Sequence, residues 1–231
     1  MSETDLTRTA IVTGGTGGLG AAVVARLLDD GWRVVVPWVS ERELARVQGH
    51  ERLALVQADL FDADAAGSVA REAGAGTRAV VNLVGGFAAG GRLHETPVDE
   101  LEAQLRLNLR PAWLVTAAAL PAMLAAGEGS VVCVSSRTAL LPFSGGAAYA
   151  ISKRAVLGLV DALHVEYAHD GIRTNAILPS VIDTPGNRAA MPEADSSAWV
   201  TPAQIAATIS FLVSPAAAAT SGAHVPVYGG A

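Results

Sequence analysis

Several kinds of residue are scarce in this sequence, and each scarcity argues against a class of protein. Cys133 is the single cysteine among 231 residues, so no intrachain disulfide can form and a reducing compartment, the cytoplasm by default, is expected. Lysine and arginine number 16 against 22 aspartates and glutamates, which gives a formal net charge of −6. Because the basic residues are also scattered, no nucleic-acid partner is expected.

Long apolar runs and metal-ligand patterns are missing as well. No uninterrupted apolar stretch approaches the roughly 20 residues of a membrane helix, and the acidic start over 1–5 does not resemble a secretory signal. His164 and His169 are five residues apart, so they do not share a helix face as two metal ligands on a helix would. We expect a soluble protein with no membrane partner and no catalytic metal.

Small and aliphatic residues are abundant and occur in alternating segments. Hydrophobic residues make up 51% of the chain and aromatic residues 5%, which suits helices packed closely on a buried sheet. Strand-like and helix-like segments alternate throughout, and this predicts a single α/β domain over 1–231, a doubly wound parallel sheet with helices on both faces. Strands are predicted at 9–12, 34–36, 53–56, 79–81, 130–134 and 173–178, and helices at 19–29, at 97–125 with a break near Pro111, and at 149–169.

Two of these segments suggest further features. The helix over 149–169 is apolar on nearly every side, so one face can pack on the sheet while the other needs a partner, most simply a second subunit. The segment 185–197 is rich in proline, glycine, asparagine, serine and charged residues, and it follows the sixth strand. Because α/β folds bind ligands at the carboxyl ends of strands, we predict a mobile substrate flap over 185–200, with a plain surface loop as the alternative.

A glycine-rich turn, TGGTGGLG over 13–20, joins the first predicted strand to the first helix. Glycines let the backbone approach a pyrophosphate, and the N-terminus of the following helix favours negative charge. Strand, turn and helix occur in the order that this use requires. The turn therefore predicts a dinucleotide site.

Tyr149 and Lys153 are four residues apart on a predicted helix, so their side chains share one face. A phenol with a pKa of about 10 is a poor acid–base catalyst at neutral pH, and a nearby ammonium lowers that pKa by favouring phenolate. Such a pair alone is usually no more than two neighbours on a helix surface. Here Ser135 and Ser136 end a strand shortly before the pair, and Asn108 precedes them all.

Together and in this order, these elements resemble the short-chain dehydrogenase/reductase family, which has the Rossmann fold, over essentially the whole chain. The turn matches TGxxxGxG, and Tyr149 with Lys153 matches YxxxK. The resemblance implies that Tyr149 exchanges a proton with the substrate while NAD(H) or NADP(H) exchanges hydride. It also implies that Lys153 lowers the tyrosine pKa and bridges the nicotinamide ribose. Ser136, rather than Ser135, would hold the developing alkoxide, and Asn108 would support a water beside the lysine.

Other positions match the family less closely. The resemblance implies that Asp59, with Leu60 beside it, contacts the adenine. The segment 82–85 stands where the family often has NNAG, 175–180 resembles its NxxxPG turn, and 227–230 resembles its C-terminal strand and glycine pair. The implied cofactor-binding residues are Gly14, Thr16, Gly18, Leu19, Gly20, Trp38, Asp59, Leu60, Asn82, Gly85, Tyr149, Lys153, Pro179, Ile182 and Thr184.

The choice between the two cofactors depends on the residue after the second strand, where a carboxylate grips the ribose 2′-hydroxyl and a basic residue favours a 2′-phosphate. Trp38 stands there, and the glycine turn has no basic residue. Arg42 could reach a phosphate, although an exposed arginine is the simpler interpretation. We expect a weak preference for NAD(H). Arg137 and Arg188 could bind an anionic substrate, or both could be solvated.

The substrate is expected to be a small carbonyl or alcohol compound. The glycine-rich stretch 85–91 is similar to a loop of dihydropteridine reductases, and reductases of 3-oxoacyl thioesters fit the remaining pattern equally well. The family resemblance also implies a homo-oligomer, a dimer or, preferably, a tetramer. A redox sensor that binds a dinucleotide without turnover is the alternative outside enzymes, but it would have little reason to keep the four catalytic residues together.

Overall fold

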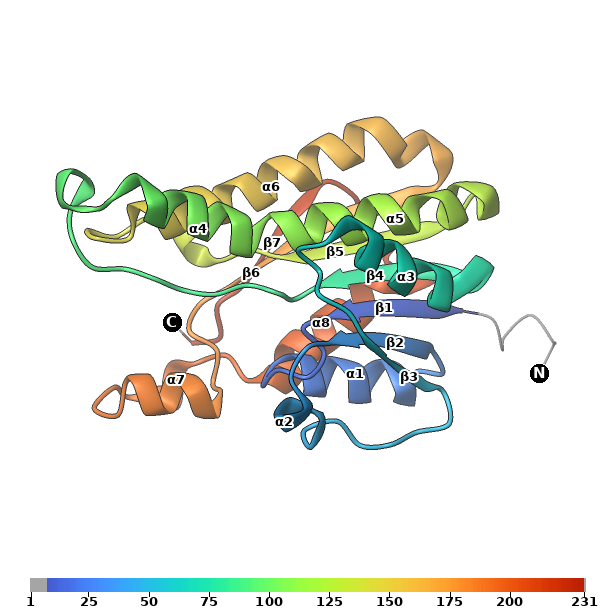
Figure 1. Cartoon of the computed structure of the whole chain (residues 1–231), viewed down its shortest axis with the longest axis horizontal. Coiled ribbons are helices and arrows are strands. Elements are labelled where there is room, and N and C mark those ends of the chain that lie inside the picture. Colours follow the sequence, from blue (N-terminus) through green and yellow to red (C-terminus); the bar gives the residue numbers. More distant parts are fainter. Residues whose placement is uncertain (1–7, 231) are drawn as a thin grey trace.

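A parallel sheet runs through the centre of the computed structural model, which describes residues 8–230 (Figure 1). The acidic start over 1–5, with its expected lack of a secretory signal, lies outside these residues. Within 8–230 the strands pair in the order β3-β2-β1-β4-β5-β6-β7. This order reverses between β1 and β4, which is where α/β folds bind their ligands. The strands are β1 Thr9–Thr13, β2 Arg33–Trp38, β3 Leu53–Gln57, β4 Thr77–Asn82, β5 Gly129–Val134, β6 Ile172–Pro179 and β7 Ala223–Val227.

Helices cover both faces of the sheet (Figure 1). One face carries α3, α4, α5 and α6, the other carries α1 and α8, and the short helices α2 and α7 lie at the rim. The predicted fold class, a single doubly wound α/β domain, is confirmed. The helices are α1 Gly20–Asp29, α2 Glu41–Leu44, α3 Ala63–Ala73, α4 Val98–Asn108, α5 Arg110–Ala126, α6 Ala147–Tyr167, α7 Pro185–Ala190 and α8 Pro202–Val213.

The central strands are apolar on both sides because each strand faces two helical layers. Ile11 and Val12 are neighbours in β1 and both are fully buried, but they point to opposite faces of the sheet. Ile11 belongs to the core beneath α3, α5 and α6, and Val12 to the core beneath α1 and α8. Each such side chain contributes about 1.5–3 kcal/mol on burial, so the continuous apolar runs that predicted the strands also hold the layers together.

The predicted elements are found, with a few different boundaries. The break between α4 and α5 falls at Leu109 because Pro111 occupies the first turn of α5, where its missing N–H costs nothing. The last strand is Ala223–Val227, so only Val227 of the tail over 227–230 belongs to it, and the strand begins earlier than expected. It is an edge strand that contains Pro226, which is tolerated at an edge and conceals the strand pattern in the sequence.

The helices α4 and α5 follow one another with only Leu109 between them, and α5 is the apolar one of the two. Over Val98–Ala126 they contain an 18-residue window that is apolar enough to cross a membrane by length and composition alone. In this fold they pack against α3, α6 and β4. The core helix of a soluble protein has the same composition, so the stretch is no more than weak evidence for a membrane span.

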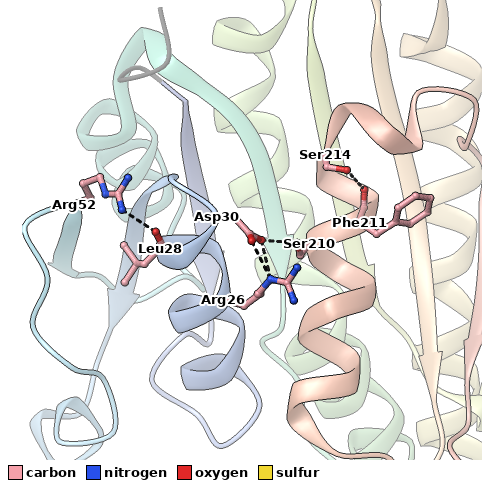
Figure 2. Close-up of polar contacts among 7 residues, drawn as sticks. All are labelled: Arg26, Leu28, Asp30, Arg52, Ser210, Phe211 and Ser214. Carbon is pink, nitrogen blue, oxygen red and sulfur yellow. Dashed lines mark hydrogen bonds and ion pairs between the residues drawn. The ribbon is translucent and has the colours of Figure 1, made fainter. Parts of the chain in front are cut away.

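Contacts at the amino ends of the strands join α1 to α8. Asp30, at the end of α1, accepts hydrogen bonds from Arg26 Nε at 3.0 Å and from the Ser210 hydroxyl on α8 (Figure 2). Arg52 Nη2 donates to the Leu28 carbonyl at 2.9 Å. A hollow of about 400 Å³ opens beside Arg26 and Ser210. It lies at the edge of the sheet opposite to the carboxyl ends where the predicted site residues gather.

Candidate active site

The glycine turn after β1 has the geometry of an anion site. Gly14 has a φ of +66°, a conformation that favours glycine, and a Cβ at Gly20 would lie 2.0 Å from the Gly14 carbonyl oxygen. Leu19 is the N-cap of α1, so no side chain caps the helix, and its first turn contains no acidic residue. The first N–H groups of α1 are therefore free of side-chain acceptors at the end of the helix that attracts negative charge.

The loop after β6 closes over this turn. Pro179 is the buried last residue of β6, and Ile182 forms a parallel bridge to Val200. Thr184 caps α7 by accepting from the Asn187 N–H at 3.3 Å. A Cβ added to Gly18 would lie 3.3 Å from Thr184 Cγ2, so turn and loop touch although 166 positions separate the two residues (184 − 18). The predicted flap over 185–200 contains α7 and a 3₁₀ turn at Ser196–Ala198.

Ser136 and Tyr149 come together where β5 ends and α6 begins. Ser136 follows β5 and accepts from the Thr138 N–H at 3.1 Å, and Tyr149 lies in the first turn of α6. Ser135 instead donates its hydroxyl hydrogen bond to the Lys153 carbonyl at 2.7 Å and is 2% exposed. Ser135 thus ties β5 to α6, which leaves Ser136 as the serine hydroxyl available beside the phenol.

Tyr149 and Lys153 share a helix face as predicted, but the pKa of Tyr149 is not lowered. Lys153 Nζ lies 5.9 Å from the centre of the Tyr149 ring and donates to the Val134 carbonyl at 3.2 Å. Burial lowers the pKa of Lys153 to about 8, against a smaller opposing effect of Cys133. Burial likewise raises the pKa of Tyr149, opposed in part by the Ser136 hydroxyl. The pKa of Tyr149 is thus raised rather than lowered as expected, because burial of the phenol has the largest effect on it.

Asn108 is the centre of a buried hydrogen-bond network at the end of α4. Its Oδ1 accepts from the Gly86 N–H at 3.0 Å, and its Nδ2 donates to Gln104 Oε1 and Ser152 Oγ, both at 3.1 Å. The Ser152 hydroxyl donates to the Tyr149 carbonyl at 2.8 Å. Gln104 was not predicted from the sequence, although it lies one helical turn before Asn108. It is only 6% exposed, and a buried glutamine needs a hydrogen-bond partner such as Asn108.

A pair of phenylalanines borders the phenol on its open side. Phe87, from the glycine-rich stretch after β4, meets Tyr149 edge to face with ring centres 5.0 Å apart. Phe143 stacks on Phe87 at 6.3 Å. They are 65% and 46% exposed, which is unusual for large apolar rings and marks a surface available to an apolar ligand. We call Phe87 and Phe143 the aromatic rim.

The two arginines predicted to bind substrate have different surroundings. Arg188 forms a two-point ion pair with Asp183, with Nη2 2.9 Å from Oδ2. The positive charge of Arg188 is therefore already paired with the Asp183 carboxylate of the same loop. Arg137 directly follows Ser136 and is half-buried, and its guanidinium carbon lies 5.2 Å from the centre of the Tyr228 ring. Among residues 8–230 its side chain has no ion pair or hydrogen bond, so Arg137 is the arginine left to meet an anion.

The predicted adenosine contacts are only partly available. Trp38 ends β2 and is half-buried, and Asp59 is exposed with one carboxylate oxygen 3.0 Å from the Phe61 nitrogen. The Leu60 side chain is buried in the core, and the Asn82 amide donates to Thr116 Oγ1 at 3.0 Å inside the protein. Both can contact a cofactor only through their backbone, because their side chains stabilise the core instead.

These residues fit an extended dinucleotide. The uncapped N-terminus of α1 suits a pyrophosphate. At the other end, a Cβ on Gly85 would lie 2.7 Å from Asn108 Oδ1 and 2.9 Å from Lys153 Nζ, so the absence of a side chain keeps the surroundings of the lysine open. Among the described residues, no cluster of three or more histidine, cysteine, aspartate or glutamate side chains could hold a metal ion.

Known proteins match the chain over most of its length. The family model described as short chain dehydrogenase matches residues 8–195. The 2-(R)-hydroxypropyl-CoM dehydrogenase of Xanthobacter autotrophicus is 37% identical over 191 residues, which cover 78% of this chain and 76% of the relative. The cis-4-hydroxycyclohexanecarboxylate dehydrogenase of Sinomonas cyclohexanicum is 33% identical over 246 aligned positions, which cover 100% of this chain and 98% of the relative.

Solved structures agree with the fold. ElxO with NADP bound matches at a TM-score of 0.89, with 97% of this chain and 98% of that chain covered, at 23% identity. That likeness supports the fold, and the family model supports the family, since it spans well over half of the chain and includes Tyr149 and Lys153. The chain belongs to the short-chain dehydrogenase family and is an NAD(P)-dependent oxidoreductase.

Proposed function

We propose that this protein interconverts an alcohol and its carbonyl compound, with Tyr149 as the group that exchanges the proton. The observation that carries the proposal is the placement of the Tyr149 phenol between the Ser136 hydroxyl and the open aromatic rim. A substrate that lies on the rim meets both hydroxyls at once. The nicotinamide supplies or takes up the hydride when it is bound.

The chain's own residues divide the remaining work. In reduction, Tyr149 donates its proton to the substrate oxygen, and in oxidation it receives one. The raised pKa of Tyr149 keeps the phenol protonated at neutral pH, which suits the donor role in reduction. Ser136 donates a hydrogen bond to the same oxygen as its negative charge develops. The network through Asn108 and Ser152 holds the first turn of α6, and therefore the phenol, in place.

The substrate we propose is a compact alcohol that carries an anionic group. Phe87 and Phe143 offer apolar contact, and Arg137 offers a positive charge next to Ser136. The relative from Sinomonas cyclohexanicum, which is covered over 98% of its length, is named for such a compound, a hydroxycyclohexanecarboxylate. A preference for NAD(H) and closure of 185–200 over the bound substrate are part of the same proposal.

A comparison of matched substrates tests this function. Oxidation of 4-hydroxycyclohexanecarboxylate and of cyclohexanol would be measured with the wild type, Arg137→Met and Arg188→Met. We expect Arg137→Met to raise KM for the carboxylate about tenfold or more, the loss typical of a charge-assisted contact, and to leave cyclohexanol unchanged. Arg188→Met serves as the control because its partner is Asp183. Equal use of both substrates by the wild type would contradict the anionic substrate.

A further inference from the structure

The glycine turn carries a contact that the motif does not require. The buried Thr16 side chain donates a hydrogen bond to Glu43 Oε2 at 2.9 Å. Arg46 Nη1 donates to the other carboxylate oxygen of Glu43 at 3.2 Å and to the Thr16 carbonyl at 3.3 Å. Glu43 lies in α2, 27 residues from Thr16 in sequence. Glu43 and Arg46 therefore form a pair of opposite charges fixed on the turn.

This charge pair lies between the glycine turn and the end of β2, the two elements that a bound dinucleotide contacts. The pyrophosphate belongs on the turn, and the adenosine ribose belongs beside the end of β2, where Trp38 provides no charge. The helix α2 follows β2 after two residues and reaches back to the turn. The Glu43 carboxylate is thus placed on the ribose side of the turn, a position that β2 itself leaves without a carboxylate.

We propose that Glu43 selects NAD(H) over NADP(H) by accepting the 2′-hydroxyl of the adenosine ribose and repelling a 2′-phosphate. This inference rests on the proposed function for the presence of the cofactor. A carboxylate oxygen has two acceptor positions, so Glu43 keeps capacity for a ribose hydroxyl while it holds Thr16. A 2′-phosphate at the same place would bring about two further negative charges against the carboxylate.

Arg46 has a defined part in this arrangement. It offsets part of the Glu43 charge, and its Nη1 is engaged by the carboxylate and by the Thr16 carbonyl rather than directed at a phosphate. Its side chain is 53% exposed and that of Glu43 is 40% exposed, so solvent screens the pair and the selection should be moderate. Arg42, the residue first considered as a phosphate partner, has no contact of this kind among residues 8–230.

Direct binding tests the inference without any substrate. Dissociation constants for NADH and NADPH would be measured by nucleotide fluorescence, with calorimetry as a check, for the wild type, Glu43→Gln and Glu41→Gln. Glutamine keeps the size and the acceptor for Thr16 but removes the charge. Glu41 lies in the same helix and is exposed, so its variant changes the net charge equally at a position without the contact to the turn.

We expect the wild type to bind NADH about tenfold more tightly than NADPH, the discrimination of a single well-placed polar group. Glu43→Gln should reduce that ratio to about one, mainly through tighter NADPH binding, while Glu41→Gln keeps the wild-type ratio. A ratio unchanged in Glu43→Gln, or equally changed in both variants, would overturn the inference and leave the proposed function standing. Tighter NADPH binding by the wild type would do the same and would assign Arg46 to the phosphate. Binding of neither nucleotide would overturn the proposed function and, with it, the inference.

Discussion

The Lys153 ammonium nitrogen lies 5.9 Å from the centre of the Tyr149 ring and donates to the Val134 carbonyl. The two side chains share a helix face, but in the protein alone each is buried and each is driven toward its neutral form. Burial therefore weakens the charged form of Lys153, and a ligand that stabilises the ammonium should raise its pKa. This relationship predicts that cofactor binding and the protonation of Lys153 are linked.

The affinity for cofactor should accordingly fall in alkaline solution. The Lys153 pKa is about 8 without ligand, so the ammonium is present below pH 8 and is lost above it. If a bound ribose holds the charged form, affinity should fall up to about tenfold for each pH unit above 8. Fluorescence titrations of NADH from pH 6.5 to 9.5 measure this, and Lys153→Met should bind more weakly but show no such decline. A wild-type affinity that is constant over this range would contradict the linkage.

Gln104 should position Asn108 for catalysis. Replacement by leucine removes one of the two acceptors of the Asn108 amide, and we expect the free energy of unfolding to fall by about 1–3 kcal/mol. Because Asn108 Oδ1 also holds Gly86 next to the site, kcat should fall several-fold while the dissociation constant for cofactor hardly changes. Denaturant unfolding and steady-state kinetics separate the two effects. A loss of stability with kcat intact would assign Gln104 a purely structural role.

The outward face of α6 should bury itself against a second copy of the chain. Ile151 and Val165 are 47% and 77% exposed, and Gly158 lies midway between them with open space around it. The spacing of seven residues places all three on one stripe of the helix. Sedimentation at micromolar concentration should give a dimer or tetramer for the wild type.

Val165→Glu should shift the same measurement toward smaller species, because it introduces a charge into the expected interface. Val98→Glu is the matched control, since Val98 is 64% exposed at the start of α4 rather than on α6. A wild type that is monomeric at this concentration would argue against the interface, as would equal dissociation of both variants.

The elements that could be predicted from the sequence are those whose pattern is local. Short windows of sequence are enough to recognise three of them. These are the valine-rich strands buried on both faces, the glycine turn, and the four-residue spacing of Tyr149 and Lys153. The edge strand β7, with Pro226 and an exposed side, does not. The choice of Ser136 over Ser135 came from the family resemblance rather than from a local pattern.

What could not be predicted depends on contacts between distant segments. No rule of spacing brings Glu43 onto Thr16, or Phe87 onto Phe143 beside the phenol. The electrostatic error had the same origin, because adjacency of Tyr149 and Lys153 was evident while their burial was not. Burial is set by the layers of the fold, and it reversed the expected direction of the tyrosine pKa.

The role of Tyr149 as the proton-exchanging group is tested most directly by Tyr149→Phe. Turnover of an accepted alcohol and the dissociation constant for NADH would be compared with those of the wild type and of Tyr167→Phe, which removes a phenol hydroxyl at the far end of the same helix. We expect Tyr149→Phe to keep its fold and bind NADH nearly as tightly as the wild type, while kcat falls by about 10² to 10⁴. Tyr167→Phe should behave as the wild type. A kcat near the wild-type value in Tyr149→Phe would contradict the account.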